Sequence, residues 1–198
     1  MNAANALTIF RIMLTPFFVA FLFKEGAWPT YIATLFFLVA ALSDYFDGYL
    51  ARRRGLVTRL GRFLDPLADK LLTSAAFISL ALMKIIAAWI VYVIIIREII
   101  ITGLRVYALS RKNPLITSRL AKWKTSSQMF VIFIILLFLC FTKYQSPESG
   151  LVLASSSWMY WVVNGMVFIV TVLAVATGIH YLIQNLTFSR KTIEDQGQ

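Results

Sequence analysis

The sequence is poor in charge, cysteine, proline and glycine. Of its 198 residues only 14% are charged, and it holds 5 prolines, 9 glycines and 1 cysteine. So little glycine and proline excludes a collagen-like chain or a flexible linker, and one cysteine excludes a disulfide framework or a cysteine-rich metal site. Soluble domains contain about 25% charged residues, so the low charge and the 60% of hydrophobic residues exclude an ordinary soluble domain. We treat residues 1–198 as a single domain.

Six long apolar stretches account for most of the chain. A membrane-spanning helix needs about 20 mostly apolar residues, and short segments with Lys, Gly, Pro, Asn or Ser separate the six stretches. The first stretch lacks a basic segment before it and a cleavage site after it, so we expect it to persist rather than to be removed as a signal peptide. The sequence predicts an all-α integral membrane protein with six transmembrane helices, at about 7–23, 28–50, 66–83, 87–109, 125–142 and 158–186.

Basic residues are concentrated on alternate connections between these stretches. The chain has 19 Lys and Arg against 9 Asp and Glu, which gives a net charge of +10. Thirteen of the 19 lie around the second and fourth connections or in the tail. Basic connections stay in the cytoplasm, so both termini are predicted to face it. This charge suits anionic lipid headgroups, and we expect no nucleic-acid partner.

Four of the nine acidic residues fall within one short window, residues 44–69. Asp44 and Asp47 are three residues apart near the end of the second stretch, and Asp65 and Asp69 are four residues apart at the start of the third. Each pair therefore shares a helix face. Ionisable groups at membrane depth cost several kcal/mol unless they are paired or functional. The cluster predicts a bound cation.

The surroundings of the aspartates narrow the kind of ligand. Gly48, Ala51 and Gly61 stand near the two pairs and leave space beside the carboxylates. Oxygen ligands without clustered His or Cys favour hard cations such as Mg²⁺, Mn²⁺ or Ca²⁺, and two such ions about 3.5–4 Å apart assist displacement at phosphorus. For each pair alone a structural alternative exists: an N-cap at Asp65 before Pro66, or a turn at Asp47.

Residues 44–69 also carry a complete motif. They read D-Y-F-D-G-Y-L-A-R, eight further residues, and G-R-F-L-D-P-L-A-D. This resembles the signature D-x2-D-G-x2-A-R-x8-G-x3-D-x3-D of the CDP-alcohol phosphotransferases at all eight fixed positions. Outside the motif, the segments that begin at Arg97 and Lys122 most resemble the bacterial phosphatidylglycerophosphate synthase branch of that family.

The resemblance implies a fold, a reaction and a set of site residues. The implied fold is the six-helix CDP-alcohol phosphotransferase fold, commonly a homodimer, in the bacterial inner membrane with the site facing the cytoplasm. The implied reaction transfers the phosphatidyl group of CDP-diacylglycerol to sn-glycerol 3-phosphate and releases CMP. Two divalent cations, Mg²⁺ or Mn²⁺, would be held by Asp44, Asp47 and Asp65, with Asp69 completing the site and acting as general base. The positions that match the nucleotide site are Gly48, Ala51, Arg52 and Gly61.

The phosphate of such an acceptor requires cationic partners. Arg105, Lys122 and Lys124 lie near the predicted cytoplasmic ends of their helices, and Arg11 lies at the corresponding depth of the first helix. We predict that these four bind the acceptor phosphate, with snorkelling to the interface as the alternative. Glu98 lies deeper and is expected to orient Arg105 or to neutralise Arg97.

Two other functions remain compatible with the pattern. The same chemistry could use inositol phosphate, serine or phosphatidylglycerol as acceptor, and only residues 97–128 distinguish these. A divalent-cation transporter also places carboxylates in a membrane, but it predicts acids spread along a route through the bilayer.

Overall fold

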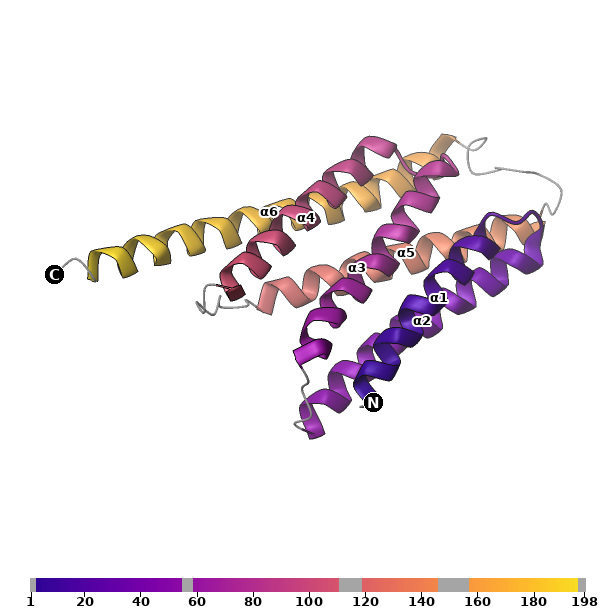
Figure 1. The fold of residues 1–198 in the computed structure, drawn as a ribbon. Coiled ribbons are helices and arrows are strands. Elements are labelled where there is room, and N and C mark those ends of the chain that lie inside the picture. Colours follow the sequence, from indigo (N-terminus) through magenta and orange to yellow (C-terminus); the bar gives the residue numbers. More distant parts are fainter. Residues whose placement is uncertain (1–2, 55–58, 111–118, 146–156, 196–198) are drawn as a thin grey trace.

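The structure, a computed structural model, consists of six α-helices, and the part of the chain that it describes contains no β-strand. It describes the backbone of residues 3–54, 59–110, 119–145 and 157–195, and the side chains of residues 8–43, 70–103, 126–144 and 158–179. The expected all-α class is confirmed. The helices are α1 (Ala3–Leu22), α2 (Ala27–Arg54), α3 (Arg59–Leu82), α4 (Ala88–Ser110), α5 (Arg119–Gln145) and α6 (Ser157–Asp195) (Figure 1).

Several helices extend beyond the apolar stretches that predicted them. The largest differences are the start of α3 at Arg59 instead of 66, the start of α5 at Arg119 instead of 125, and the end of α6 at Asp195 instead of 186. Hydropathy marks where a helix is apolar, whereas the helix itself continues through charged residues such as Arg and Lys, which are good helix formers. These three extensions adjoin the basic connections and the basic tail described above.

These extensions remove both structural alternatives for the aspartate pairs. Asp65 lies well inside α3, so it is not the N-cap of that helix, and Pro66 lies in the helix interior. Asp47 and Gly48 lie inside α2, so they do not form a turn. Neither pair is explained by local backbone capping.

Successive helices run in opposite directions along the molecule (Figure 1). One end of the bundle therefore carries the starts of α1, α3 and α5 and the ends of α2, α4 and α6. Both chain termini lie towards this end, and α6 projects beyond the other five helices there. We call it the terminal end of the bundle.

The core is formed by side chains of all six helices. Phe18 of α1 and Phe37 of α2 are both almost fully buried, with ring centroids 5.6 Å apart. The two helices are joined through Gly26, whose φ of 102° is readily adopted only by glycine. Fully buried aliphatic and aromatic residues of α3 and α5 continue this core: Leu72, Phe77, Leu80, Ile132, Ile135 and Leu136. Buried residues of α4 and α6 extend it, among them Ile90, Ile94, Val163 and Val167.

A buried asparagine ties α6 to the turn between α3 and α4. The Oδ1 of Asn164 accepts a hydrogen bond from the backbone N–H of Ala87 at 2.7 Å. Its Nδ2 donates to the carbonyl oxygens of Ile85 (3.4 Å) and Tyr160 (2.9 Å). The bonds to Ala87 and Ile85 satisfy backbone groups that precede α4 and fix the start of that helix, at the end of the bundle opposite the terminal end.

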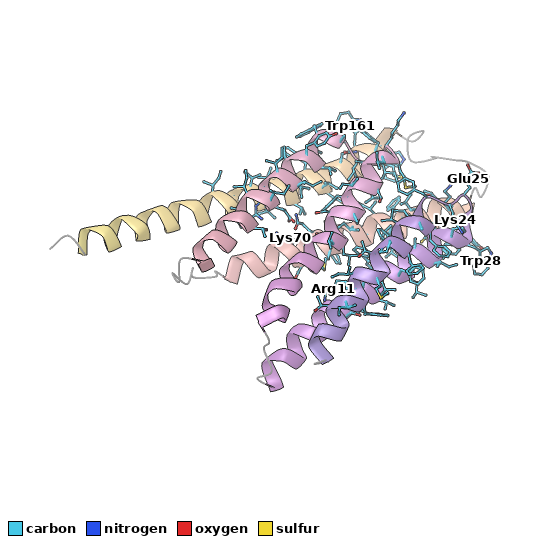
Figure 2. All side chains as sticks on the ribbon, in the orientation of Figure 1. Arg11, Lys24, Glu25, Trp28, Lys70 and Trp161 are labelled. Atoms are coloured by element: carbon cyan, nitrogen blue, oxygen red, sulfur yellow. The ribbon has the colours of Figure 1, made fainter. Side chains whose placement is uncertain are left out.

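The outer surface of the bundle is largely apolar. Each helix exposes large hydrophobic side chains, among them Phe17, Leu35, Leu82, Ile99, Phe130 and Ile169. Contiguous apolar surface on this scale is rare on soluble monomers and suits contact with hydrocarbon. Within the described side chains, two helical segments are long and apolar enough to cross a membrane, Ser126–Tyr144 and Trp158–Ile179. Trp28 and Trp161, both strongly exposed, lie towards the end of the bundle opposite the terminal end, as Figure 2 shows.

Candidate active site

The four aspartates lie on the hairpin formed by α2 and α3, at matching distances from its tip. Asp44 precedes the end of α2 by as many residues as Asp69 follows the start of α3. Asp47 and Asp65 lie closer to the tip, and their distances from it also match to within a single residue. Asp44 lies about 15 Å along the helix axis from the end of α2, and Asp69 lies the same distance from the start of α3. The two helices are in contact. The backbone thus brings the two pairs to corresponding levels near the terminal end.

This arrangement fits a hard cation better than any other ligand type. The anionic donors on the hairpin are its four aspartates, and neither α2 nor α3 contains His or Cys. Among the side chains that the structure describes, no group of three or more His, Cys, Asp or Glu forms a metal site elsewhere; the four aspartate side chains lie outside that set. All four positions lie within one part of the bundle, whereas an ion pathway would distribute acids along it.

The structure describes one of the predicted cationic side chains, Arg11. It lies on α1, which contacts both α2 and α3, and it is only 1% exposed. A buried arginine costs far more than one that snorkels to an interface, so topology does not account for it. The other predicted residues lie on described helices but have side chains outside the described set: Gly48, Ala51 and Arg52 on α2, Gly61 on α3, Arg105 on α4, and Lys122 and Lys124 on α5.

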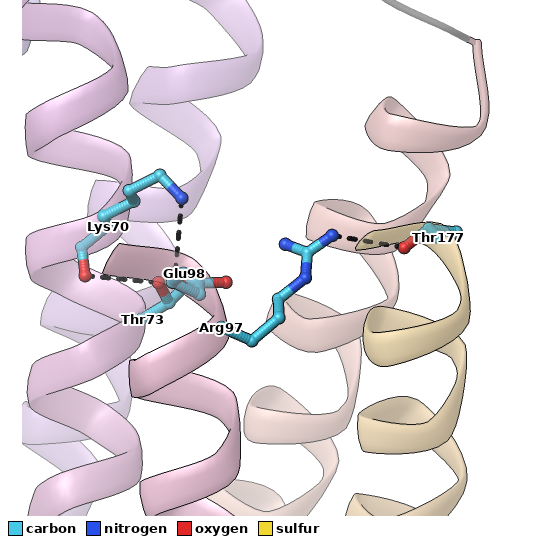
Figure 3. Close-up of polar contacts among 5 residues, drawn as sticks. All are labelled: Lys70, Thr73, Arg97, Glu98 and Thr177. Atoms are coloured by element: carbon cyan, nitrogen blue, oxygen red, sulfur yellow. Dashed lines mark hydrogen bonds and ion pairs between the residues drawn. The ribbon is translucent and has the colours of Figure 1, made fainter. Parts of the chain in front are cut away.

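An ion pair that was not predicted from the sequence links α3 to α4. The Nζ of Lys70 lies 3.5 Å from Oε2 of Glu98 (Figure 3). Glu98 is buried and Lys70 is partly buried. The sequence contained a signal, because Lys70 and Glu98 are opposite charges within helices that follow one another, and a charge inside an apolar bundle needs a partner. Lys70 directly follows Asp69, so the pair fixes α4 beside the aspartate hairpin.

Arg97 points to the opposite side of α4. Its guanidinium donates a hydrogen bond to Oγ1 of Thr177 on α6 at 3.3 Å, as Figure 3 shows. It also lies against Gly178, where an added Cβ would approach Nε to 3.0 Å. The groove between α4 and α6 at this point has a volume of about 270 Å³ and an apolar lining apart from Arg97. Such a lining does not suit a soluble phosphate, so the acceptor site is not expected on this side.

Polar side chains are buried or partly buried at one level inside the bundle, next to the aspartate hairpin. We call this set the polar layer. Its members come from all of the first five helices: Thr8, Arg11, Ser43, Lys70, Thr73, Glu98, Thr102 and Gln128. Buried polar groups cost free energy unless they are paired or used, and towards the opposite end these same helices bury mainly apolar side chains. The polar layer therefore marks the inner boundary of the site.

Comparison with known proteins agrees with the family that the aspartate motif resembles. The model of the CDP-alcohol phosphatidyltransferase family matches residues 1–179. The CDP-diacylglycerol–glycerol-3-phosphate 3-phosphatidyltransferase of Bacillus subtilis (strain 168) is 38% identical over 148 residues, which cover 69% of this chain and 77% of that protein. The proteins of the same description from Escherichia coli (strain K12) and Salmonella typhimurium (strain LT2) are 40% and 39% identical over 136 residues, covering 66% of this chain and 74% of each relative.

The ion pair between Lys70 and Glu98 generates a stability prediction. Lys70→Met leaves the Glu98 carboxylate buried without this cation, and we expect a loss of about 1–3 kcal/mol, less than for a fully buried pair because the Lys70 side chain is 27% exposed. The double variant Lys70→Met/Glu98→Gln should recover part of this loss, since no buried charge is left. Thermal unfolding in detergent measures both, with exposed Lys24→Met as the control that should not change. A double variant that is destabilised more than Lys70→Met would contradict the interaction between the two side chains.

Proposed function

Because the chain belongs to the CDP-alcohol phosphatidyltransferase family, we propose that it transfers the phosphatidyl group of CDP-diacylglycerol to sn-glycerol 3-phosphate. The products are phosphatidylglycerophosphate and CMP, a step of phospholipid biosynthesis. The observation that carries this proposal is the identity of 38% and 40% to relatives whose names state this donor and this acceptor. The full aspartate motif on the α2–α3 hairpin also supports the reaction class.

The reaction requires a nucleophile, a leaving group and a proton acceptor. A hydroxyl oxygen of glycerol 3-phosphate attacks the β-phosphorus of CDP-diacylglycerol, and the bond from that phosphorus to the oxygen of CMP breaks. Asp69 accepts the proton of the attacking hydroxyl as general base. It lies one helical turn from Asp65 on the same face of α3, so it stands beside the predicted phosphate site, and in-line placement of the two substrates provides much of the rate.

The site is proposed to work with two divalent cations, Mg²⁺ or Mn²⁺. Asp44, Asp47, Asp65 and Asp69 would hold them, and the hairpin supports this because it supplies oxygen donors at two matching levels. Bound cations would neutralise the pyrophosphate and the departing phosphate of CMP.

The remaining site residues are assigned to the substrates. Gly48, Ala51 and Gly61 would leave space for the cytidine nucleotide, with Arg52 as its charged partner. Arg11, Arg105, Lys122 and Lys124 would bind the phosphate of glycerol 3-phosphate. For Arg11 the support is its place as a buried cation on α1, a helix that contacts both α2 and α3.

The proposed setting is the bacterial inner membrane, with all six helices spanning it. The terminal end would face the cytoplasm, because the basic residues of the connections lie on that side. A lipid donor and a soluble acceptor meet only at such an interface, and the aspartate hairpin lies towards the terminal end. We further propose a homodimer, as is common in this family.

An acceptor panel tests the function. The purified full chain in detergent with CDP-diacylglycerol and Mg²⁺ should release CMP and form lipid product with glycerol 3-phosphate, and not with serine, inositol phosphate or phosphatidylglycerol. Lipid product is identified by mass spectrometry and CMP by chromatography. Turnover with another acceptor in place of glycerol 3-phosphate would contradict the acceptor assignment. If no acceptor in the panel leads to CMP release, the reaction itself is contradicted.

Removing single carboxylates tests the cation site. Asp44→Asn, Asp47→Asn and Asp65→Asn should each abolish turnover, because each loses a charged ligand oxygen, while the thermal unfolding of the protein without substrate stays nearly unchanged. Excess chelator should abolish turnover of the unmodified protein, and added Mg²⁺ or Mn²⁺ should restore it. Full turnover in chelator would refute the two-cation proposal.

A further inference from the structure

Gln128 of α5 is a buried amide with an unused donor. Its side chain is 1% exposed, and its Nε2 has no hydrogen-bond partner among the described residues. Asn164 provides the comparison, because it is also a buried amide but makes hydrogen bonds to Ala87, Ile85 and Tyr160. Leaving a buried donor without a partner costs free energy. The free energy is recovered if a ligand supplies the missing acceptor.

Thr102 of α4 carries a second buried polar group that has no hydrogen-bond partner among the described residues. Buried hydroxyls in these helices normally donate to the carbonyl four residues earlier, as Thr15, Thr34 and Ser43 do at 2.9, 2.9 and 2.7 Å. The Oγ1 of Thr102 is buried and makes no such bond within the described part of the chain. Two helices that follow one another thus each present one unused polar group.

Both groups stand directly behind predicted phosphate-binding cations. Gln128 follows Lys124 by four residues, and Thr102 precedes Arg105 by three. These spacings place each polar group on the same helix face as its cation, about one turn (roughly 5.4 Å) deeper in the bundle. A ligand whose phosphate meets Arg105 and Lys124 would therefore extend its remaining atoms towards Thr102 and Gln128.

Contacts between neighbouring helices place Gln128 at the level of the first aspartate pair. Antiparallel α2 and α5 touch where Thr34 Oγ1 lies 3.2 Å from Cys140 Sγ. We compare the number of residues from this contact towards the terminal end on each helix. Gln128 is more residues from Cys140 than Asp44 is from Thr34, and fewer than Asp47 is from Thr34. Because the rise per residue is the same in both helices, Gln128 lies between the levels of Asp44 and Asp47.

The ion pair between α3 and α4 gives the corresponding result for Thr102. Lys70 and Glu98 lie 3.5 Å apart on these antiparallel helices. Thr102 lies one helical turn from Glu98 towards the terminal end. In the same direction along α3, Asp69 is the neighbour of Lys70, and Asp65 lies one turn beyond Asp69. Both unused groups therefore lie at the depth where the reacting phosphorus is expected.

We propose that Gln128, assisted by Thr102, binds the non-reacting hydroxyl of the acceptor and so selects a phosphorylated polyol. This inference rests on the proposed function and deepens it. A hydroxyl is both donor and acceptor, and an amide offers both complements. The N–H group of Gln128 cannot ligate a cation, and an acyl chain has no acceptor for it. A site built to bind a hydroxyl discriminates strongly against a substrate that lacks it, because its polar groups are then left unpaired.

The test combines Gln128→Met with an acceptor that lacks one hydroxyl. We expect Gln128→Met to raise the KM for glycerol 3-phosphate about 5- to 10-fold, the loss of one hydrogen bond, and to leave the KM for CDP-diacylglycerol within about 2-fold. The unmodified protein should use 3-hydroxypropyl phosphate, which has only the reacting hydroxyl, less well than glycerol 3-phosphate. Gln128→Met should lose this preference, and its thermal unfolding without substrate should occur at the same or a higher temperature.

Asn164→Leu is the matched control. It removes a buried amide whose hydrogen bonds are made, so it should lower the unfolding temperature and leave the preference between the two acceptors intact. Thr102→Val is the second test variant and should reproduce the selective effect if Gln128→Met does not fold.

Three results would overturn the proposal. The first is that Gln128→Met leaves the KM for glycerol 3-phosphate and the acceptor preference unchanged. The second is that it raises the KM values for both substrates equally. The third is that it raises only the KM for CDP-diacylglycerol, which would assign Gln128 to the nucleotide. If the unmodified protein forms no lipid from glycerol 3-phosphate, the proposed function fails as well. That failure can be distinguished from a failure of the Gln128 proposal alone, because CMP release by the unmodified protein then does not depend on glycerol 3-phosphate.

Discussion

The cost of placing polar and charged groups inside an apolar helix bundle governs the organisation of this molecule. Towards the end opposite the terminal end the bundle buries mainly Phe, Leu and Ile, whereas Arg11, Glu98 and Gln128 are buried closer to the aspartate hairpin. In hydrocarbon each such group costs several kcal/mol unless it is paired. The ion pair between Lys70 and Glu98 offsets part of this cost and fixes α4 beside α3. The polar layer thus coincides with the level at which a phosphate-transfer site is expected.

Much of the fold could be predicted from the sequence, because one property dominates it. Six apolar stretches predicted six helices, and their alternation with basic connections predicted that both termini lie at one end (Figure 1). Helix ends were predicted less well, as for α3, because hydropathy does not detect the helical continuation through charged residues such as Arg59 and Arg62. That continuation matters for the site, since it places Asp65 and Asp69 within a regular helix and at the levels of Asp47 and Asp44.

The site was predictable to the extent that it is local in sequence. The two aspartate pairs follow from spacing alone, whereas the partner of Glu98 depends on how α3 and α4 pack. Glu98 was expected to act on Arg97 or Arg105, and the structure adds a contact with Lys70 that was not expected. It also shows that Arg97 donates to Thr177 on α6. Neighbours along one helix cannot reveal which helix lies opposite. The unused amide of Gln128 likewise becomes visible only once the atoms around it are known.

The most direct test of this account is anomalous scattering from crystals of the full chain grown with Mn²⁺ and CDP-diacylglycerol. The account predicts two manganese peaks about 3.5–4 Å apart, between α2 and α3 and within ligand distance of Asp44, Asp47, Asp65 and Asp69. Manganese peaks only at other positions, or no peak on the α2–α3 hairpin at saturating Mn²⁺, would contradict it.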